Sequence, residues 1–290
     1  MEAPKKKPTV LDFLEMKRSG RKITMVTAYD YAFASIVDSV DIDIILVGDS
    51  GAMTTLGYET TVPVSMEEML AMARAVARGA KNTFLVGDMP FLSYEVSVEK
   101  AVENAGRFLK EAGMDAVKLE GGRRVAPVIQ AIVRAGIPVM GHIGLTPQSL
   151  SQLGGFRVQG KDVDSARAVV EDALALQEAG AFAVVVEAVP APVGEMITRA
   201  LRVPTIGIGA GPHCDGQVLV LHDLLGLFER FVPKFVKRYA NLAASAREAL
   251  ACFAAEVRGG VFPAPEHCYS MKPDQAAALR EQLEQAGFLR

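Results

Sequence analysis

The tetrapeptide Leu-Val-Gly-Asp occurs twice in the chain, each time at the end of an apolar run. Two later apolar runs also stop at a single acidic residue. Short apolar runs of this kind are typical of buried strands, and a charged side chain is rarely buried unless it is paired or binds a metal. Four such strands therefore indicate that their ends meet at one polar site. The four acids are Asp49, Asp88, Glu120 and Glu187.

Eight strand-like runs alternate along the chain with helical segments or loops. That order predicts parallel strands joined by crossover helices. A closed (β/α)8 barrel fits better than an open sheet, because such barrels take about 250 residues and the chain has 290. The predicted fold class is therefore α/β, a (β/α)8 TIM barrel with additional C-terminal helices.

The sequence contains no segment that marks a domain boundary. We expect a single (β/α)8-barrel domain over residues 1–290, with residues 1–8 as a disordered tail and residues 233–290 as a C-terminal helical extension. Two long segments, residues 50–64 and 144–161, are predicted to be loops. Loops of this length are often functional, so both are candidates for closing over a site.

Local patterns predict several individual elements. Ser65 followed by Glu68 three residues later indicates a capping box at the start of a helix. The run at residues 216–222 is interpreted as the eighth strand, with a helix as the open alternative. Long helices are expected at residues 235–257 and 273–285.

A glycine-rich stretch, residues 207–211, is similar to a phosphate-binding loop. It lacks the ending of a Rossmann fingerprint and the lysine of a Walker motif. We therefore expect a tight loop at the top of the barrel there.

The charge balance gives no electrostatic footprint for nucleic acid, because Lys and Arg number 31 against 34 Asp and Glu, for a net charge of −3. The N-terminus lacks the apolar region of a secretion signal, and no apolar run reaches membrane-spanning length. Three widely spaced cysteines without a CxxC motif argue against a disulfide framework or a zinc site. We expect a cytoplasmic protein without nucleic-acid or membrane partners. The cysteines are Cys214, Cys252 and Cys268.

The active sites of (β/α)8 barrels lie at the C-terminal ends of the strands, where the four acids fall. Lys118 and Glu120 are two residues apart and share one face of their strand, and a buried lysine needs an acidic partner. Carboxylates that lie close together repel one another unless a cation is present. Oxygen ligands without cysteines or paired histidines favour Mg²⁺ or a similar hard metal.

Two or three of the acids would hold the ion and leave positions for a chelating substrate such as a 2-oxo acid, whose enolate the metal would stabilise. An acid that is not a ligand would act as general base, and Glu187 is the candidate because it lies outside the repeated tetrapeptide. Each acid taken alone is also explained as the N-cap of the following helix. His142 either contacts substrate or is a hydrogen-bonded core histidine, and its position leaves both open.

These residues lie within phrases by which the sequence strongly resembles the ketopantoate hydroxymethyltransferase family. The match runs in order from about residue 9 to about residue 265 and is more specific than any single motif. The matching phrases are Thr27-Ala28-Tyr29-Asp30-Tyr31, Val47-Gly48-Asp49-Ser50, Leu56-Gly57-Tyr58, Gly87-Asp88-Met89-Pro90, Val117-Lys118-Leu119-Glu120-Gly121-Gly122, Gly141-His142-Ile143-Gly144-Leu145-Thr146-Pro147-Gln148, Glu187-Ala188-Val189-Pro190, Gly207-Ile208-Gly209-Ala210-Gly211 and Cys214-Asp215-Gly216-Gln217.

The resemblance implies a Mg²⁺-dependent barrel enzyme for the first step toward pantothenate and coenzyme A. It would transfer a one-carbon unit from the co-substrate 5,10-methylenetetrahydrofolate to 3-methyl-2-oxobutanoate and give 2-dehydropantoate. It also implies a homo-oligomer, often a decamer in this family. By the resemblance, the metal residues are Asp49, Asp88 and Glu120, and the proton acceptor is Glu187. The expected substrate contacts are Asp49, Ser50, Asp88, Lys118 and His142.

Two other functions stay open at this point. A Mg²⁺-dependent 2-oxo-acid lyase or mutase of the phosphoenolpyruvate/pyruvate barrel group would turn over its substrate without folate. A non-catalytic oxo-acid-binding barrel would bind ligand without metal-dependent proton exchange, although the intact set of Lys118, Glu120 and Glu187 argues against it. No motif marks a pterin site, so the sequence predicts no folate-binding residue.

Overall fold

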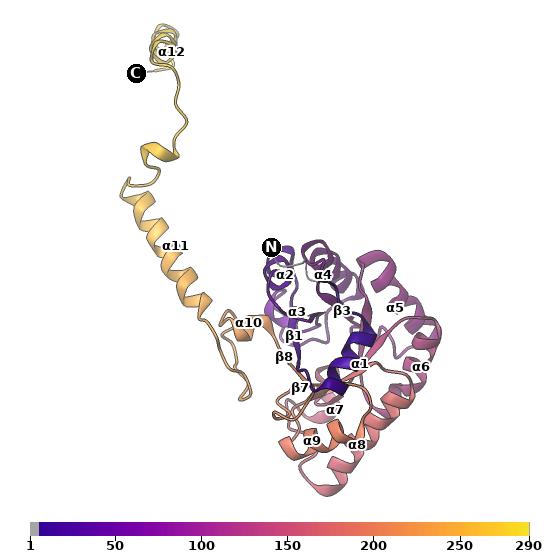
Figure 1. Cartoon of the computed structure of the whole chain (residues 1–290). Coiled ribbons are helices and arrows are strands. Elements are labelled where there is room, and N and C mark those ends of the chain that lie inside the picture. Colours follow the sequence, from indigo (N-terminus) through magenta and orange to yellow (C-terminus); the bar gives the residue numbers. More distant parts are fainter. Residues whose placement is uncertain (1–5, 290) are drawn as a thin grey trace. The chain divides into compact units, whose positions relative to one another are not determined.

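The computed structural model describes residues 6–289, and within them eight parallel strands close into a barrel in the order of the sequence (Figure 1). Each strand pairs with its neighbours along the chain, and β1 pairs with β8 to close the ring. The predicted (β/α)8 barrel is confirmed. The strands are β1 (Ile23–Thr27), β2 (Ile44–Val47), β3 (Phe84–Asp88), β4 (Ala116–Glu120), β5 (Val139–Gly144), β6 (Ala183–Glu187), β7 (Thr205–Ile208) and β8 (Gly216–Leu219).

The register of the strands brings the predicted site residues to neighbouring positions. Lys118 of β4 pairs with Asp88 of β3, and Glu120 pairs with His142 of β5. Glu187 is the last residue of β6. Because the strands are parallel, their C-terminal ends lie at the same edge of the barrel, and so do these side chains.

Helices follow the strands and surround the barrel (Figure 1). Ser65 and Glu68 form the predicted capping box at the start of α4, which supplies partners for backbone N–H groups that a helix start leaves free. The helices of the barrel unit are α1 (Val10–Ser19), α2 (Tyr31–Asp38), α3 (Gly51–Thr54), α4 (Met66–Gly79), α5 (Val98–Ala112), α6 (Ala126–Arg134), α7 (Leu150–Leu153), α8 (Val163–Glu178), α9 (Ala191–Ala200) and α10 (Leu221–Leu224).

Helix α1 closes the N-terminal end of the barrel with an aromatic plug. The buried ring of Phe13 lies edge-on to Phe84, with ring centres 5.1 Å apart, and stacks at 6.3 Å on Phe182. Aromatic pairs at such distances add to the apolar burial of each ring. The interior is therefore packed at this end, and the opposite end, where the strands terminate, is the one that is open to ligands.

Two segments predicted to be loops contain short helices. The segment 50–64 begins with α3, and the segment 144–161 contains α7. Both helices are a single turn of four residues. A single turn does not repeat the 3.6-residue period often enough to stand out in a sequence, which explains why the pattern missed them.

The eighth strand was predicted at residues 216–222, but β8 ends at Leu219. Pairing with β1 ends at Leu219, and the helical alternative holds for the last two residues, which belong to α10. The backbone N–H of Leu221 donates to the Thr27 hydroxyl at 2.9 Å. That side-chain bond replaces a strand-to-strand bond and turns the chain away from the sheet.

The expected long helix at residues 235–257 begins seven residues later than predicted, as α11 (Leu242–Arg258). Phe235 lines the cavity at the barrel mouth instead, and the N–H of Tyr239 donates to the carbonyl of Leu224 at 2.8 Å. These tertiary contacts override the local apolar pattern, because burying a phenylalanine ring outweighs the small differences in helix propensity.

The chain divides into two compact units, of which the first ends at Ala240 and the second is Asn241–Arg290. The second unit contains α11 and α12 (Pro273–Gln285), the latter with the predicted bounds, and neither helix has a buried side chain. The predicted organisation as one domain with a tail at 1–8 and an extension at 233–290 stays a prediction, and residues 1–5 lie outside the described residues. None of the helices within residues 6–289 is long and apolar enough to cross a membrane.

Candidate active site

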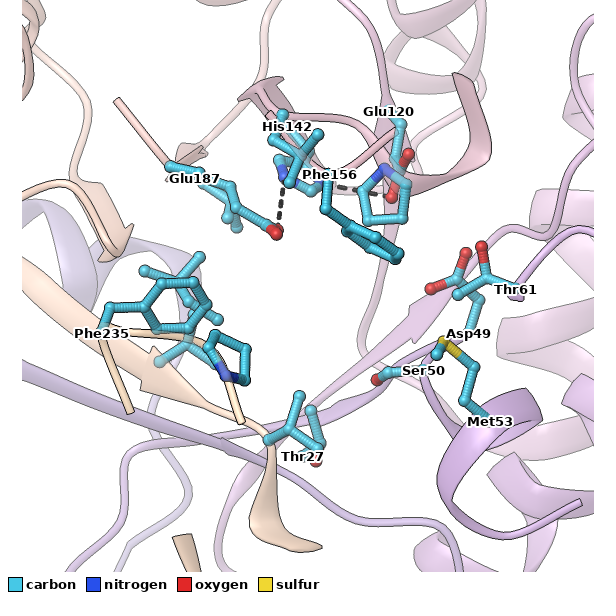
Figure 2. Close-up of a pocket in the computed structure, with 18 of the residues that line it drawn as sticks. Thr27, Asp49, Ser50, Met53, Thr61, Glu120, His142, Phe156, Glu187 and Phe235 are labelled. Atoms are coloured by element: carbon cyan, nitrogen blue, oxygen red, sulfur yellow. Dashed lines mark ion pairs between the residues drawn. The ribbon is translucent and has the colours of Figure 1, made fainter. Parts of the chain in front are cut away.

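A cavity of about 360 Å³ opens at the C-terminal end of the barrel (Figure 2). All of the site residues predicted from the sequence line it, although they come from five different strand ends. Its size is typical of a site for a small organic ligand. The predicted residues that line it are Asp49, Ser50, Asp88, Lys118, Glu120, His142 and Glu187.

Lys118 occupies the floor of the cavity and ties two of the acids together. Its Nζ lies 2.8 Å from Asp88 Oδ1 and 3.5 Å from Glu120 Oε1, and all three side chains are almost fully buried. Burial by itself lowers the pKa of Lys118, but the charges of Asp88, Glu120 and Asp49 outweigh it and raise the pKa above its ordinary value. The lysine is therefore a permanent cation at neutral pH.

One lysine does not neutralise the three acids around it. Burial raises the pKa of Asp49 well above its ordinary value, and the charges of Asp88 and Glu120 raise it further. Burial likewise raises the pKa of Asp88, against the opposing effect of Lys118. Buried carboxylates that resist ionisation indicate a deficit of positive charge, which a bound divalent cation would fill.

The oxygens of these acids differ in how far they are already occupied. Both oxygens of Glu120 have partners: Oε1 lies 3.3 Å from His142 Nδ1, and Oε2 accepts from the backbone N–H of Gln148 at 3.0 Å. Asp49 uses Oδ2 as acceptor for the Gln148 amide at 3.0 Å, and Asp88 uses Oδ2 as acceptor for the N–H of Asp49 at 3.1 Å. Asp88 Oδ1 lies 2.8 Å from the Lys118 ammonium, whereas Asp49 Oδ1 has no hydrogen-bond donor among residues 6–289.

Within residues 6–289, no three His, Cys, Asp or Glu side chains converge as a complete metal-binding set. A full protein cage is not required for Mg²⁺, which is commonly held by one or two carboxylates, waters and substrate oxygens. Asp49 fits that pattern as a direct ligand through its open oxygen, and Asp88 fits it through Oδ1, which it would share with the Lys118 ammonium. Glu120, whose oxygens contact His142 and the Gln148 N–H, fits an outer position in which it would bind a metal-bound water.

His142 lies between Glu120 and Glu187. Its Nδ1 is 3.3 Å from Glu120 Oε1, and its Nε2 is 3.2 Å from Glu187 Oε2 without being aligned for a hydrogen bond. Burial and the charge of Lys118 lower the pKa of His142, but Glu120 and Glu187 outweigh them and raise it to about 9. The histidine therefore lines the cavity with polar partners on both ring nitrogens, and its contact with substrate stays a prediction.

Glu187 is set apart from the other acids. It is the most exposed of the four, with 15 % of its side chain accessible, and Figure 2 shows its carboxylate pointing into the central space. The next residue, Ala188, has φ of 47°, in the left-handed region that a residue with a Cβ rarely adopts. The chain turns sharply here, so that Glu187 stays at the cavity while β6 ends.

Two residues to which the sequence assigned no role hold the acids in place. Gln148 contacts Asp49 and Glu120 as described above, and its Oε1 accepts from the Tyr94 hydroxyl at 2.6 Å. The same hydroxyl accepts from the N–H of Glu120 at 3.3 Å. The sequence pointed to Gln148 only as part of a phrase that matches the family, and no sequence pattern pointed to Tyr94. Both residues lie in loops, and the position of a loop residue depends on the folded barrel.

The outer wall of the cavity is apolar and aromatic. Figure 2 shows Phe156 and Phe235 bordering the same space as Asp49 and Glu187. Phe231 also lines the cavity and lies 5.8 Å from Phe156 between ring centres. These residues too were not identified from the sequence, since exposed aromatic residues in a loop have no periodic pattern.

Comparisons with known proteins identify the family of the chain. A family model described as ketopantoate hydroxymethyltransferase matches residues 7–265. The chain is 59 % identical over 266 residues to a 3-methyl-2-oxobutanoate hydroxymethyltransferase from Heliobacterium modesticaldum, covering 92 % of this chain and 96 % of the relative. A protein of the same name from Syntrophus aciditrophicus is 58 % identical over 254 residues, with 88 % and 93 % covered.

Solved structures share the fold at low sequence identity. A phosphonopyruvate hydrolase in complex with oxalate and Mg²⁺ superposes with a TM-score of 0.58 and 16 % identity, covering 97 % of this chain and 99 % of that one. A 2,3-dimethylmalate lyase of the PEP mutase/isocitrate lyase superfamily gives 0.55 and 14 %, covering 97 % and 99 %. At this identity the likeness concerns the barrel alone.

Proposed function

The chain belongs to the ketopantoate hydroxymethyltransferase family, and from that premise we propose how its own residues carry out the reaction. It has 3-methyl-2-oxobutanoate hydroxymethyltransferase activity, the first step of pantothenate biosynthesis. The donor is 5,10-methylenetetrahydrofolate. The C3–H bond of the oxo acid breaks, C3 bonds to the donor's methylene carbon, and both methylene–nitrogen bonds break. Water supplies the new hydroxyl group, and the two nitrogens of the folate end protonated.

The oxo acid binds on the floor of the cavity. Lys118 offers its positive charge to the substrate's oxygens, and Ser50, whose Oγ lies 2.9 Å from the Tyr29 hydroxyl, offers a positioned hydroxyl. Asp49 and Asp88 would hold Mg²⁺ directly, with Glu120 in the outer position. When bound, the ion would draw electron density from the keto oxygen and so acidify the C3 hydrogen.

Glu187 takes the C3 proton. The observation that carries this assignment is its separation from the other acids: Glu187 contacts His142 and no member of the Asp49–Asp88 pair. An acid that does not hold the metal is free to accept a proton. His142 Nε2 lies 3.2 Å from Glu187 Oε2, and as a cation the histidine balances the negative charge on Glu120 and Glu187.

The test is proton NMR in D₂O with 3-methyl-2-oxobutanoate, first with Mg²⁺ or EDTA and then with the methylene donor added. We expect Mg²⁺-dependent loss of the C3 proton signal, followed by a hydroxymethyl signal once the donor is present. Exchange without that product would favour a lyase or mutase of the phosphoenolpyruvate/pyruvate barrel group. Absence of both signals from folded, metal-loaded protein would favour a non-catalytic oxo-acid-binding barrel.

We also propose that the protein is a homo-oligomer, and by family resemblance a decamer. Exposed apolar side chains of the second unit support association of several copies of the chain. Monomeric proteins seldom expose many apolar side chains on one helix. In α11 they include Leu250, Phe253 and Val257. Native mass spectrometry would give the number of copies.

Three free cysteines support the proposed cytoplasmic location.

A further inference from the structure

We propose that the aromatic outer wall of the cavity is the binding site of the folate donor. Phe156, Phe231 and Phe235 would contact its two ring systems, and Arg157 and Lys234 would pair with the carboxylates of its glutamate tail. This inference rests on the proposed function, because it places the second substrate of that reaction in the same cavity.

The cavity has two chemically different parts. Its floor carries the charged side chains at the strand ends, whereas its outer wall comes from two segments outside the strands, residues 145–158 and 228–235. A five-carbon oxo acid needs only the polar floor. The aromatic wall offers apolar surfaces on which the faces of the two ring systems that flank the reactive methylene group of the donor would pack.

Two aromatic side chains of the wall are largely exposed, which is unfavourable unless a ligand covers them. Phe156 is 48 % exposed and Phe231 46 %, and their rings contact each other with centres 5.8 Å apart and planes tilted by 35°. Both also line a second hollow of about 490 Å³ that adjoins the cavity. An elongated ligand that starts at the floor would therefore pass these two rings on its way out.

Phe235 borders the inner part of the wall because a glycine makes room for it. Gly209 has φ of 64°, and a Cβ at that position would lie 2.6 Å from Cδ1 of Phe235. The glycine-rich stretch that ends β7 thus serves to seat this ring above the floor, rather than to bind phosphate. The ring lies beside the part of the cavity in which Glu187 would take the C3 proton (Figure 2).

The charges of the wall match the tail of the donor. Arg157 and Lys234 line the cavity, and neither forms an ion pair with a carboxylate of residues 6–289. Arg230, which lines the adjoining hollow, is committed to the backbone carbonyls of Tyr58 and Gly57, both at 3.1 Å. The oxo acid would occupy the floor, and the two available cations of the wall attract a glutamate tail, so the donor lies with its tail outward.

The experiment compares two donors and two readouts. The donors are 5,10-methylenetetrahydrofolate and 5,10-methylenetetrahydropteroate, which lacks glutamate. The readouts are the KM for the donor and the rate of C3 proton exchange without donor, which reports on the floor alone. If the wild-type protein shows neither C3 exchange nor product, the proposed function itself is refuted. The variants test the donor site only when the wild-type protein shows both activities.

Phe231→Ala and Phe156→Ala should raise the KM for both donors at least about tenfold, because each removes a ring that the donor covers. C3 exchange should change less than twofold, which also shows that the variant is folded. Phe231→Leu and Phe156→Leu keep an apolar side chain and serve if the alanine variants unfold. An unchanged KM in all folded variants would overturn the assignment of the wall to the donor's rings.

Arg157→Gln and Lys234→Met should raise the KM for the glutamate-bearing donor about fivefold to tenfold and leave the KM for the pteroate form unchanged. The matched control is Lys237→Met, which removes the same charge from the same segment at a residue that lies over the Tyr239 ring and does not line the cavity. Equal losses with both donors, or a loss as large in the control, would overturn the assignment of the two cations.

Discussion

At the scale of single residues, the site is a set of buried charges in which each group depends on its neighbours. Lys118 holds Asp88 and Glu120 together, and His142 links Glu120 to Glu187. Removing one member of such a network leaves another buried charge without its partner, which is costly. Substitutions that keep the shape of a side chain and change one atom are therefore the informative ones.

Glu187→Gln tests the proton acceptor. The amide keeps the size of the side chain but accepts no proton, so C3 exchange should fall by about 10²- to 10⁴-fold while the oxo acid still binds. Exchange by NMR in D₂O and binding by calorimetry measure the two effects separately. Glu178→Gln, the same change on the exposed face of α8, is the control. Normal exchange in the Glu187 variant would exclude it as the base.

Tyr94→Phe tests the residues that would orient the proposed metal site. It removes the hydroxyl that joins Gln148 to Glu120 and leaves the ring in place. Loss of a hydrogen bond behind the ligands commonly lowers metal affinity about 10- to 100-fold, and titration calorimetry with Mg²⁺ should show a decrease of that size. Tyr58→Phe removes a hydroxyl that binds Glu68 away from the cavity and should leave the affinity unchanged. Equal affinities in both variants would deny Tyr94 this role.

Asp223 is a buried acid with a cost that depends on pH. Burial raises its pKa from 3.8 to about 6, against the opposing charge of Arg238. The folded state therefore binds more protons than the unfolded state between these values, and stability falls as pH rises from about 4 to about 6.

Asp223→Asn should remove that cost. We expect an increase in the free energy of unfolding of about 1–2 kcal/mol at pH 8, reduced from the full value of the shift by partial solvent screening, and almost none at pH 4. Urea unfolding at the two pH values measures it. Asp164→Asn on the exposed surface of α8 is the control. A gain of equal size at both pH values would show that titration of Asp223 is not its cause.

At the scale of elements, helix starts are defined by side chains that the sequence displays. The Ser65 hydroxyl accepts from the N–H of Glu68 at 3.2 Å, and Glu68 accepts from the N–H of Ser65 at 2.8 Å. Such boxes satisfy donors that the first turn leaves free. Single-turn helices and the start of α11 have no comparable signal, because tertiary contacts decide them.

Ser65→Ala should lower the free energy of unfolding by about 1 kcal/mol, the usual cost of losing an N-cap hydroxyl. The melting temperature and the urea midpoint should both decrease. Ser35→Ala is the matched control, since Ser35 is an exposed residue within α2. If Ser35→Ala lowers the free energy of unfolding by the same amount, the effect of Ser65→Ala does not come from the capping box.

At the scale of the whole molecule, the barrel carries a stability cost for its function. Asp49 and Asp88 are buried next to other acids, and a cation that binds only the folded state recovers part of that cost. Saturation at 100 times the dissociation constant corresponds to about 2.7 kcal/mol. Adding Mg²⁺ should therefore raise the melting temperature, and EDTA should reverse the effect.

Asp49→Asn separates this effect from general salt stabilisation. Without Mg²⁺ the variant should melt at a higher temperature than the wild type, because one of the repelling carboxylates is gone, and Mg²⁺ should then add little. KCl at matched ionic strength is the control. An equal response of variant and wild type to Mg²⁺ would place the ion elsewhere.

The sequence by itself determined the barrel and the chemical identity of the site. Apolar runs that end in acids, with helical spacing between them, identify parallel strands whose C-terminal ends share one edge, and that edge is a property of the topology. Asp49, Asp88, Lys118, Glu120 and Glu187 could be named for this reason, since a residue at a strand end needs no knowledge of loops to be placed.

Only the tertiary structure decided which loop residues complete the site. Gln148 and Tyr94 reach the acids from two different loops, and Phe235 reaches the cavity where the local pattern predicts a helix. Each of these positions depends on contacts between residues far apart in the chain, such as the space that Gly209 leaves for Phe235. Local sequence patterns reveal helices and strands because their apolar residues recur at a fixed spacing. Contacts between distant residues have no fixed spacing, so they are determined only when the barrel has folded.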